Sequence, residues 1–180
     1  MFTLVYLGYV PRIASESLDS GKPRIEKIVQ LITESKFSIH DLSRLQSSER
    51  DEFYRLNMPF ELGIDFGCRS FAEGDAKFKR FLILEKERYR YQRALSDLSG
   101  SDISNHNDEP EDIVHAVRNW FRGMSSRKPP SGTVIWEDFN EFMADFYQAR
   151  EEQGYKDKDL QLMPTREYVD FVEEWLKVRR

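Results

Sequence analysis

Cysteine is nearly absent from this sequence of 180 residues, which contains Cys68 alone. A single cysteine excludes a disulfide within the chain and a zinc site built from several cysteines. Histidine is scarce too, and His40, His106 and His115 do not have the spacing of metal ligands. We therefore expect no metal and no other cofactor.

Long apolar runs and a basic excess are also missing. No stretch approaches the ~20 residues that a membrane span needs, and the first ten residues lack the basic leading region of a signal peptide. We therefore expect a cytoplasmic protein without membrane contact. The 27 lysines and arginines face 32 acidic residues, for a net charge of −5, which argues against a nucleic-acid partner. The run Arg88-Tyr-Arg-Tyr-Gln-Arg93 mixes cationic and stacking groups, but on an acidic protein it favours an amphipathic helix.

The remaining composition indicates a folded domain, since 39% of the residues are hydrophobic and 13% aromatic. Continuous apolar runs are typical of buried parallel strands, and they predict strands over residues 2–10, 37–42, 81–84 and 102–104. Apolar residues at helical spacing predict helices over 24–35, 58–71 and 85–98, another beginning at Pro110, and two aromatic-rich helices over 135–149 and from Thr165 onward.

Strands that alternate with helices call for a parallel sheet with right-handed crossovers. We expect a flavodoxin-like, three-layer α/β fold with a central parallel sheet of four or five strands, plus two C-terminal helices. The Pro- and Ser-containing segment 123–132 divides the chain into a nucleotide-binding core, residues 1–122, and a helical extension, residues 133–180. The extension would pack on the core or on a partner chain. We also expect a homo-oligomer.

Two motifs carry more specific information. Ile39-His-Asp-Leu-Ser43 ends the second expected strand, and Pro59-Phe-Glu-Leu-Gly63 begins the helix after it. Together they resemble the nucleoside 2-deoxyribosyltransferase and deoxynucleoside N-glycosidase superfamily, and more distantly the Toll/interleukin-receptor-like domains that hydrolyse NAD. The resemblance covers residues 1–105, and it implies a flavodoxin-like core and a nucleotide substrate. Proteins that resemble these families often act in bacterial antiviral defence by depleting nucleotides, and the resemblance implies such a role here.

The resemblance also implies roles for individual residues. Glu61 matches the family's catalytic glutamate, and Asp41 matches the acidic residue that helps to hold or protonate the base. Tyr9 and Arg12 fall where the family contacts base and sugar. The family joins the two motifs by a short Gly- or Ser-rich loop, whereas this chain has a long connection with Arg50, Arg55 and Asn57.

Physical chemistry supports the same residues. Breaking an N-glycosidic bond passes through an oxocarbenium-like transition state, which a carboxylate beside the anomeric carbon stabilises or traps covalently. A second acid that assists departure of the base completes the minimum set. Arg12, Arg44 and Arg55 are suited to bind phosphate through forked hydrogen bonds, with Asn57 as a further polar candidate.

Structural interpretations compete with these roles. A glutamate in the first turn of a helix also serves as a dipole partner or capping group, and Asp41 followed by Ser43 also suits a turn. Arg44 and Arg55 also suit ion pairs with nearby acids, and His40 is better explained as a structural residue. Two other functional hypotheses therefore stay open: a non-catalytic nucleotide-sensing or assembly module, and a purely structural α/β partner protein.

Overall fold

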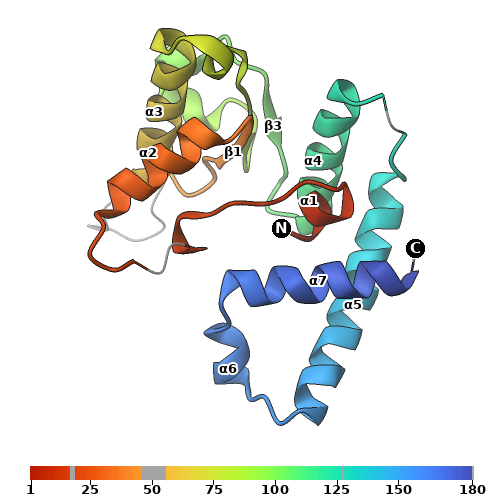
Figure 1. The fold of residues 1–180 in the computed structure, drawn as a ribbon. Coiled ribbons are helices and arrows are strands. Elements are labelled where there is room, and N and C mark those ends of the chain that lie inside the picture. Colours follow the sequence, from red (N-terminus) through yellow and green to blue (C-terminus); the bar gives the residue numbers. More distant parts are fainter. Residues whose placement is uncertain (17–18, 46–55, 127, 180) are drawn as a thin grey trace, which may run out of the picture. The chain divides into compact units, whose positions relative to one another are not determined.

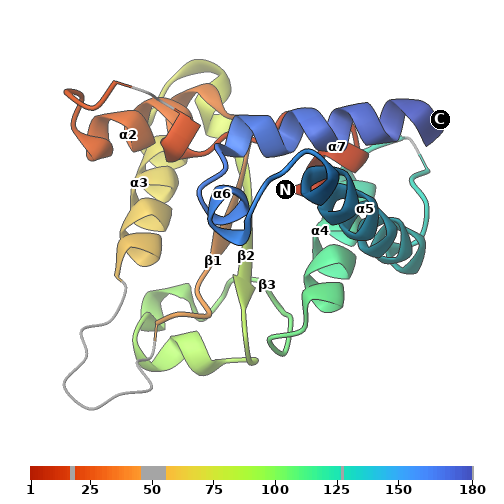
Figure 2. The same cartoon turned by 90° about the horizontal axis from the view of Figure 1, so that it is seen from below.

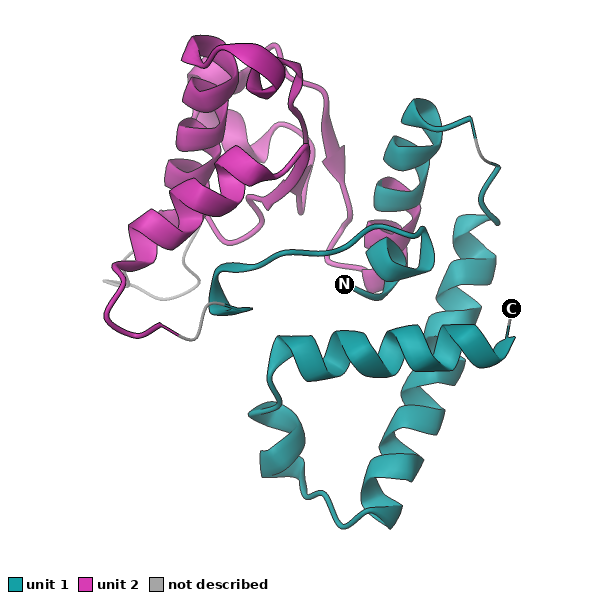
Figure 3. Cartoon of the chain, in the orientation of Figure 1, with its two compact units in different colours: residues 1–18, 117–180 teal, residues 19–116 magenta. Residues whose placement is uncertain are grey.

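The computed structural model describes residues 1–16, 19–45, 56–126 and 128–179, and the chain forms two compact units (Figures 1 and 3). The sheet unit comprises residues 19–116, and the helical unit comprises residues 1–18 and 117–180. The predicted division differs, because it placed residues 1–122 together in one core.

The sheet unit has an open sheet of three parallel strands in the order β1-β2-β3. Its elements are α2 (Arg24–Glu34), β1 (Phe37–Asp41), α3 (Asn57–Phe71), the 3₁₀ helix η2 (Gly74–Phe78), β2 (Arg80–Glu85), the 3₁₀ helices η3 (Arg90–Arg93) and η4 (Ser96–Leu98), β3 (Ile103–Asn105) and the beginning of α4 (Pro110–Met124). Figure 2 shows the strands side by side, and α3 packs on β1 and on α2. The predicted α/β class is confirmed, but the described residues form three strands rather than four or five.

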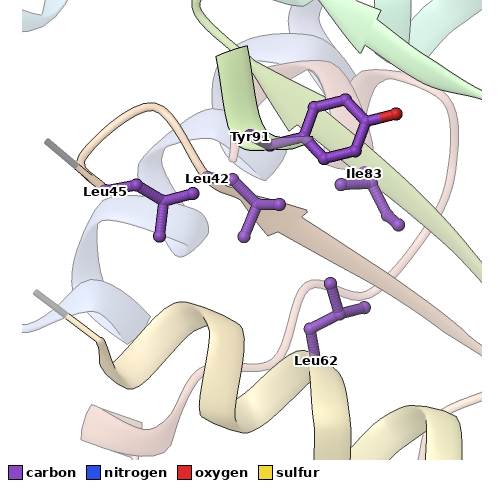
Figure 4. Packing of buried hydrophobic residues seen from close by; sticks show 5 residues of the cluster. All are labelled: Leu42, Leu45, Leu62, Ile83 and Tyr91. Atoms are coloured by element: carbon purple, nitrogen blue, oxygen red, sulfur yellow. The ribbon is translucent and has the colours of Figure 1, made fainter. Parts of the chain in front are cut away.

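The apolar patterning explains these elements. β2 is the central strand, and its residues Leu82, Ile83 and Leu84 are all buried, as a continuous apolar run in a parallel sheet indicates. On α2, Ile28 and Ile32 are buried at a spacing of one helical turn. A cluster of five buried residues connects α3, η3, β2 and the segment after β1 (Figure 4): Leu42, Leu45, Leu62, Ile83 and Tyr91.

The helical unit has a largely aromatic core. Its elements are α1 (Phe2–Tyr6), the 3₁₀ helix η1 (Ala14–Glu16), the end of α4, α5 (Gly132–Glu152), α6 (Asp157–Gln161) and α7 (Thr165–Arg179). Phe2 lies 5.3 Å from the ring of Phe142 on α5 and 6.1 Å from that of Trp175 on α7, measured between ring centroids. The two aromatic-rich C-terminal helices therefore share a core with the first residues of the chain.

The strand predicted over residues 2–10 is wrong, because Phe2–Tyr6 forms the helix α1. A short apolar run fits a buried strand and a buried helix equally well, and here packing against α5 and α7 favours the helix. Gly8 ends it with a φ of 82°, and the amides of Gly8 and Tyr9 donate to the carbonyls of Val5 and Leu4. These two bonds form a Schellman motif, which satisfies carbonyls at the helix end.

The helix predicted over residues 85–98 is also wrong, since only the short 3₁₀ helices η3 and η4 form there. Tyr89 has a left-handed φ of 64°, which interrupts a regular helix. The run 88–93 is used within the sheet unit: Tyr91 is buried, Arg90 pairs with Glu85, and Arg88 donates to Asn105. These contacts give Arg88, Arg90 and Tyr91 structural roles within the sheet unit.

Tyr168 makes the helical unit less stable as the pH becomes strongly alkaline. Its ring packs against Phe142 and Phe146 of α5, and burial, with a smaller contribution from Tyr147, raises the pKa of Tyr168 from 10.0 to about 12. The unfolded chain ionises first as the pH rises, so this contribution to stability is complete below pH 10 and is lost as the pH rises through about 12.

We therefore expect the Tm to fall across this pH range, and to fall less steeply in Tyr168→Phe. Tyr89→Phe is the matched control, since Tyr89 is exposed. If the Tm of wild type and that of Tyr168→Phe fall equally steeply with pH across this range, Tyr168 is not the source of the pH dependence.

None of the described helices is both long enough and apolar enough to cross a membrane.

Candidate functional site

Polar residues gather at the carboxyl edge of the sheet. β1 ends at Asp41, β2 ends at Glu85, and His106 follows β3 directly. The register pairs Asp41 with Leu84 and Glu85 with Asn105, so the three polar side chains stem from one edge. Open parallel sheets bind their ligands outside this edge, which makes it the candidate site of the sheet unit.

Asp41 and His106 form the first polar pair at this edge. The Nε2 atom of His106 lies 3.4 Å from Oδ1 of Asp41, and the same Oδ1 accepts the amide of Ser43 at 2.9 Å. His106 is almost wholly buried, whereas the side chain of Asp41 is 41% exposed. Asp41 therefore supports the turn after β1 and also presents a carboxylate to solvent.

Glu85 and Arg90 form a second, more deeply buried pair. Nη2 of Arg90 donates to Oε1 of Glu85 at 2.5 Å and also to the carbonyl oxygen of Ser43. Glu85 is fully buried, and its Oε1 also accepts the amide of Lys86. A buried carboxylate needs such partners. Arg90 thereby connects the segment after β1 to the end of β2 and stabilises the edge.

A buried ionic network holds α3 against β1. Asp65 on α3 is fully buried and accepts from Nε2 of His40 on β1 at 3.0 Å. Nζ of Lys79 lies 3.4 Å from the other oxygen of Asp65 and donates to carbonyls of Ile32 and Ser35. The structural interpretation of His40 is thus confirmed.

The environment of Asp65 keeps it ionised. Burial alone would raise the pKa of Asp65, but hydrogen bonds from His40 and Ser38 and the charge of Lys79 outweigh it and hold the pKa below its ordinary value.

The same contacts locate Glu61. Leu62 packs with Leu42, directly after β1 (Figure 4). Asp65 contacts His40 within β1. Glu61 precedes Asp65 by four residues, about 6 Å along the helix, so it lies at the level of the carboxyl end of β1. Its side chain is partly exposed and makes no side-chain hydrogen bond or ion pair with the residues that the structure describes. In particular, no hydrogen bond joins it to Asp41.

The remaining predicted residues are spread over both units. Tyr9 and Arg12 belong to the helical unit, where Tyr9 lies 4.0 Å from the ring of Phe121 and Arg12 pairs with Glu16. Arg44 and Asn57 are exposed residues of the sheet unit. Arg55, like Arg50, lies outside the described residues.

Sequence reasoning missed three residues of the edge: Glu85, Arg90 and His106. The spacing of the strands contained a signal for two of them. Glu85 and His106 come shortly after the third and fourth predicted strands, and Asp41 lies near the end of the second. Parallel strands end at the same edge. Arg90 carried no such signal, because its run was predicted to be a regular helix.

The helical unit contains a separate hollow of about 350 Å³, lined by Tyr6, Asp138, Trp175, Leu176 and Arg179. Its polar groups bind one another, because Tyr6 donates to Asp138 at 2.7 Å and Arg179 lies 3.4 Å from the same carboxylate. Within the described ranges, no group of three or more histidine, cysteine or acidic side chains is placed to hold a metal ion.

Comparison with family models, with curated proteins and with solved structures finds no match to this chain. The function is therefore argued from the site itself.

Proposed function

We propose that the chain cleaves or exchanges the N-glycosidic bond of a nucleotide, either NAD or a (deoxy)nucleotide, with Glu61 as the catalytic carboxylate. The observation that carries the proposal is a partly exposed glutamate without a side-chain partner among the described residues, at the level of the carboxyl edge where Asp41 also presents a carboxylate. The resemblance of the motifs 39–43 and 59–63 to the deoxyribosyltransferase and N-glycosidase superfamily supports it.

The chemistry assigns one task to each residue. The bond between the anomeric carbon and the base nitrogen breaks, and its electron pair leaves with the base. Glu61 stabilises the oxocarbenium-like carbon or bonds to it, and then a water molecule or a second base bonds to that carbon instead. Asp41 holds or protonates the departing base. Among the described residues of the sheet unit, Arg44 is the predicted cation that binds phosphate.

The other predicted properties belong to the same proposal. We expect flavodoxin-like layering around the parallel sheet, assembly into a homo-oligomer, and action in the cytoplasm on a nucleotide pool, as antiviral proteins of the families that the motifs resemble act.

A non-catalytic nucleotide-sensing or assembly module is the second candidate. The bond from the amide of Ser43 to Asp41 favours it, because a turn-forming aspartate needs no catalytic task.

Incubation of the purified chain with NAD and a panel of nucleotides and deoxynucleotides tests the proposal. We expect release of free base, detected by chromatography, and the substrate that releases it identifies the class. Ligand-induced thermal shifts without base release would favour the sensing module. Absence of both would leave the structural partner protein as the better explanation.

A further inference from the structure

We propose that His106 is a positioning residue for Asp41, which aims the free oxygen of this carboxylate at the base of the substrate. The inference rests on the proposed function and deepens it, because it adds a buried residue from a distant part of the chain to the same site. His106 and Asp41 are 65 positions apart and meet only because β1 and β3 end at the same edge.

The hydrogen bonds of His106 determine which nitrogen carries the proton. The amide of Asp108 donates to Nδ1 of His106 at 3.2 Å, so Nδ1 is the acceptor and Nε2 carries the hydrogen in the neutral ring. Nε2 faces Asp41, and the ring therefore donates to the carboxylate. A hydrogen bond at one ring nitrogen commonly determines which tautomer a histidine adopts and how its imidazole is oriented.

Asp108 is a neighbouring acidic residue of this ring, and its carboxylate also interacts with His106 through its charge. The carboxylate of Asp108 is occupied by Nζ of Lys86 at 2.8 Å, so the hydrogen bond of Asp108 with His106 comes from its backbone amide. Burial excludes water from His106, whose side chain is 2% exposed. The donor is therefore fixed in a dry environment, whereas its acceptor Asp41 remains open to solvent and to a substrate.

Both donors converge on one oxygen of Asp41. The amide of Ser43 and Nε2 of His106 bind Oδ1, and Oδ2 meets no donor among the residues that the structure describes. The two bonds fix the rotation of the carboxylate, so Oδ2 keeps one direction. The distance of 3.4 Å to Nε2 is long, as catalytic hydrogen bonds often are before the substrate binds.

A double-mutant cycle in the full chain tests this role. The four proteins are wild type, His106→Leu, Asp41→Asn and the double variant, and kcat/KM is measured by base release from the substrate that the nucleotide panel identifies. A lost hydrogen bond to a charged group corresponds to about a 10- to 100-fold decrease, which we expect for each single variant. If His106 acts through Asp41, the double variant falls no further than Asp41→Asn.

A conservative variant separates positioning from structural support. In His106→Gln the amide can still donate to Asp41 and accept from Asp108, so we expect kcat/KM within about fivefold of wild type. This variant also keeps the test valid if His106→Leu fails to fold, as circular dichroism would show. Activity in His106→Gln as low as in Asp41→Asn, with the fold intact, would overturn the positioning role.

The outcomes distinguish the inference from the proposal on which it rests. If the wild type releases base and the decreases in kcat/KM of the two single variants multiply in the double variant, the positioning role of His106 is overturned. The proposed reaction then still stands. If the wild type releases no base, the proposed reaction fails, and the same cycle is measured as the Kd for NAD by calorimetry. If the double variant then binds NAD no more weakly than Asp41→Asn, the result supports the positioning of Asp41 by His106 in a binding site. If the decreases in affinity of the two single variants multiply, or if NAD does not bind, the positioning role is overturned.

Discussion

Asp65→Asn is expected to lower the free energy of unfolding of the sheet unit by about 3–5 kcal/mol, because it leaves the charge of a buried lysine without its partner. Lys79 is 3% exposed and lies 3.4 Å from Asp65. The substitution keeps the size of the side chain, so the loss reflects charge rather than packing. It also leaves only one oxygen, an uncharged amide oxygen, to accept from His40, whose bond to Asp65 connects β1 to α3.

Hydrogen exchange of amides in β1 and α3, followed in denaturant, measures this loss. It is the suitable method because all three tryptophans, Trp120, Trp136 and Trp175, belong to the helical unit, so their fluorescence does not report on the sheet unit. Asp102→Asn is the matched control, since it removes an equal charge from an exposed position. Equal protection in the two variants would contradict the role of Asp65.

The lysine offers an independent check. Lys79→Met should be similarly destabilising, because it leaves Asp65 buried without its cation, and the double variant should be less destabilised than the sum of the two single variants. The pH dependence follows from the sign of the shift. The pKa of Asp65 lies below its ordinary value of 3.8, so this stabilisation is present above that pH and is lost as the pH falls through the lower pKa of the folded state.

Glu61→Gln is expected to lower kcat/KM for base release by about a thousandfold or more, equivalent to about 4 kcal/mol of transition-state stabilisation. The amide has the shape of the carboxylate but neither its charge nor its nucleophilic oxygen, and both are needed beside an oxocarbenium-like carbon. The fold should be unaffected, because Glu61 is partly exposed and has no side-chain partner among the described residues.

The control for this variant is Glu73→Gln, which removes the same charge from an exposed position just after α3. Base release is measured for both variants beside the wild type, with thermal unfolding as the check on folding. Undiminished turnover in Glu61→Gln would show that this carboxylate is not catalytic. Binding of a nucleotide with unchanged affinity in both variants, and turnover in none, would favour the sensing module.

Local patterns were sufficient for most elements of the sheet unit. The apolar residues of α2 and α3 recur at helical spacing, and the apolar run 81–84 belongs to β2, the buried central strand that such a run indicates. The pattern was insufficient for residues 2–6, where five consecutive apolar or small residues fit a buried strand as well as a buried helix. It was also insufficient for residues 85–98, where no regular helix forms. There Tyr89 has a left-handed backbone conformation and Arg90 pairs with Glu85.

The candidate site was predictable in part for the same reason. Asp41 and Glu61 were found because each lies inside a short motif beside a regular element, and the motif is a local property of the chain. The partners of Asp41 and of the buried Asp65 were not found by motif. His106 reaches Asp41 across 65 positions, and Lys79 reaches Asp65 from beyond the end of α3.

Periodicity depends on neighbours three or four positions away, so the amino-acid sequence was enough to determine the α/β class, most helices and the parallel strands. The grouping of residues 1–18 with the C-terminal helices, the burial of Asp65 and the pairing of His106 with Asp41 depend on contacts between distant residues. Such contacts form only when the chain folds, because burial and hydrogen bonding are properties of the packed structure. The tertiary structure therefore decided which acidic residues are structural and which face solvent at the edge of the sheet.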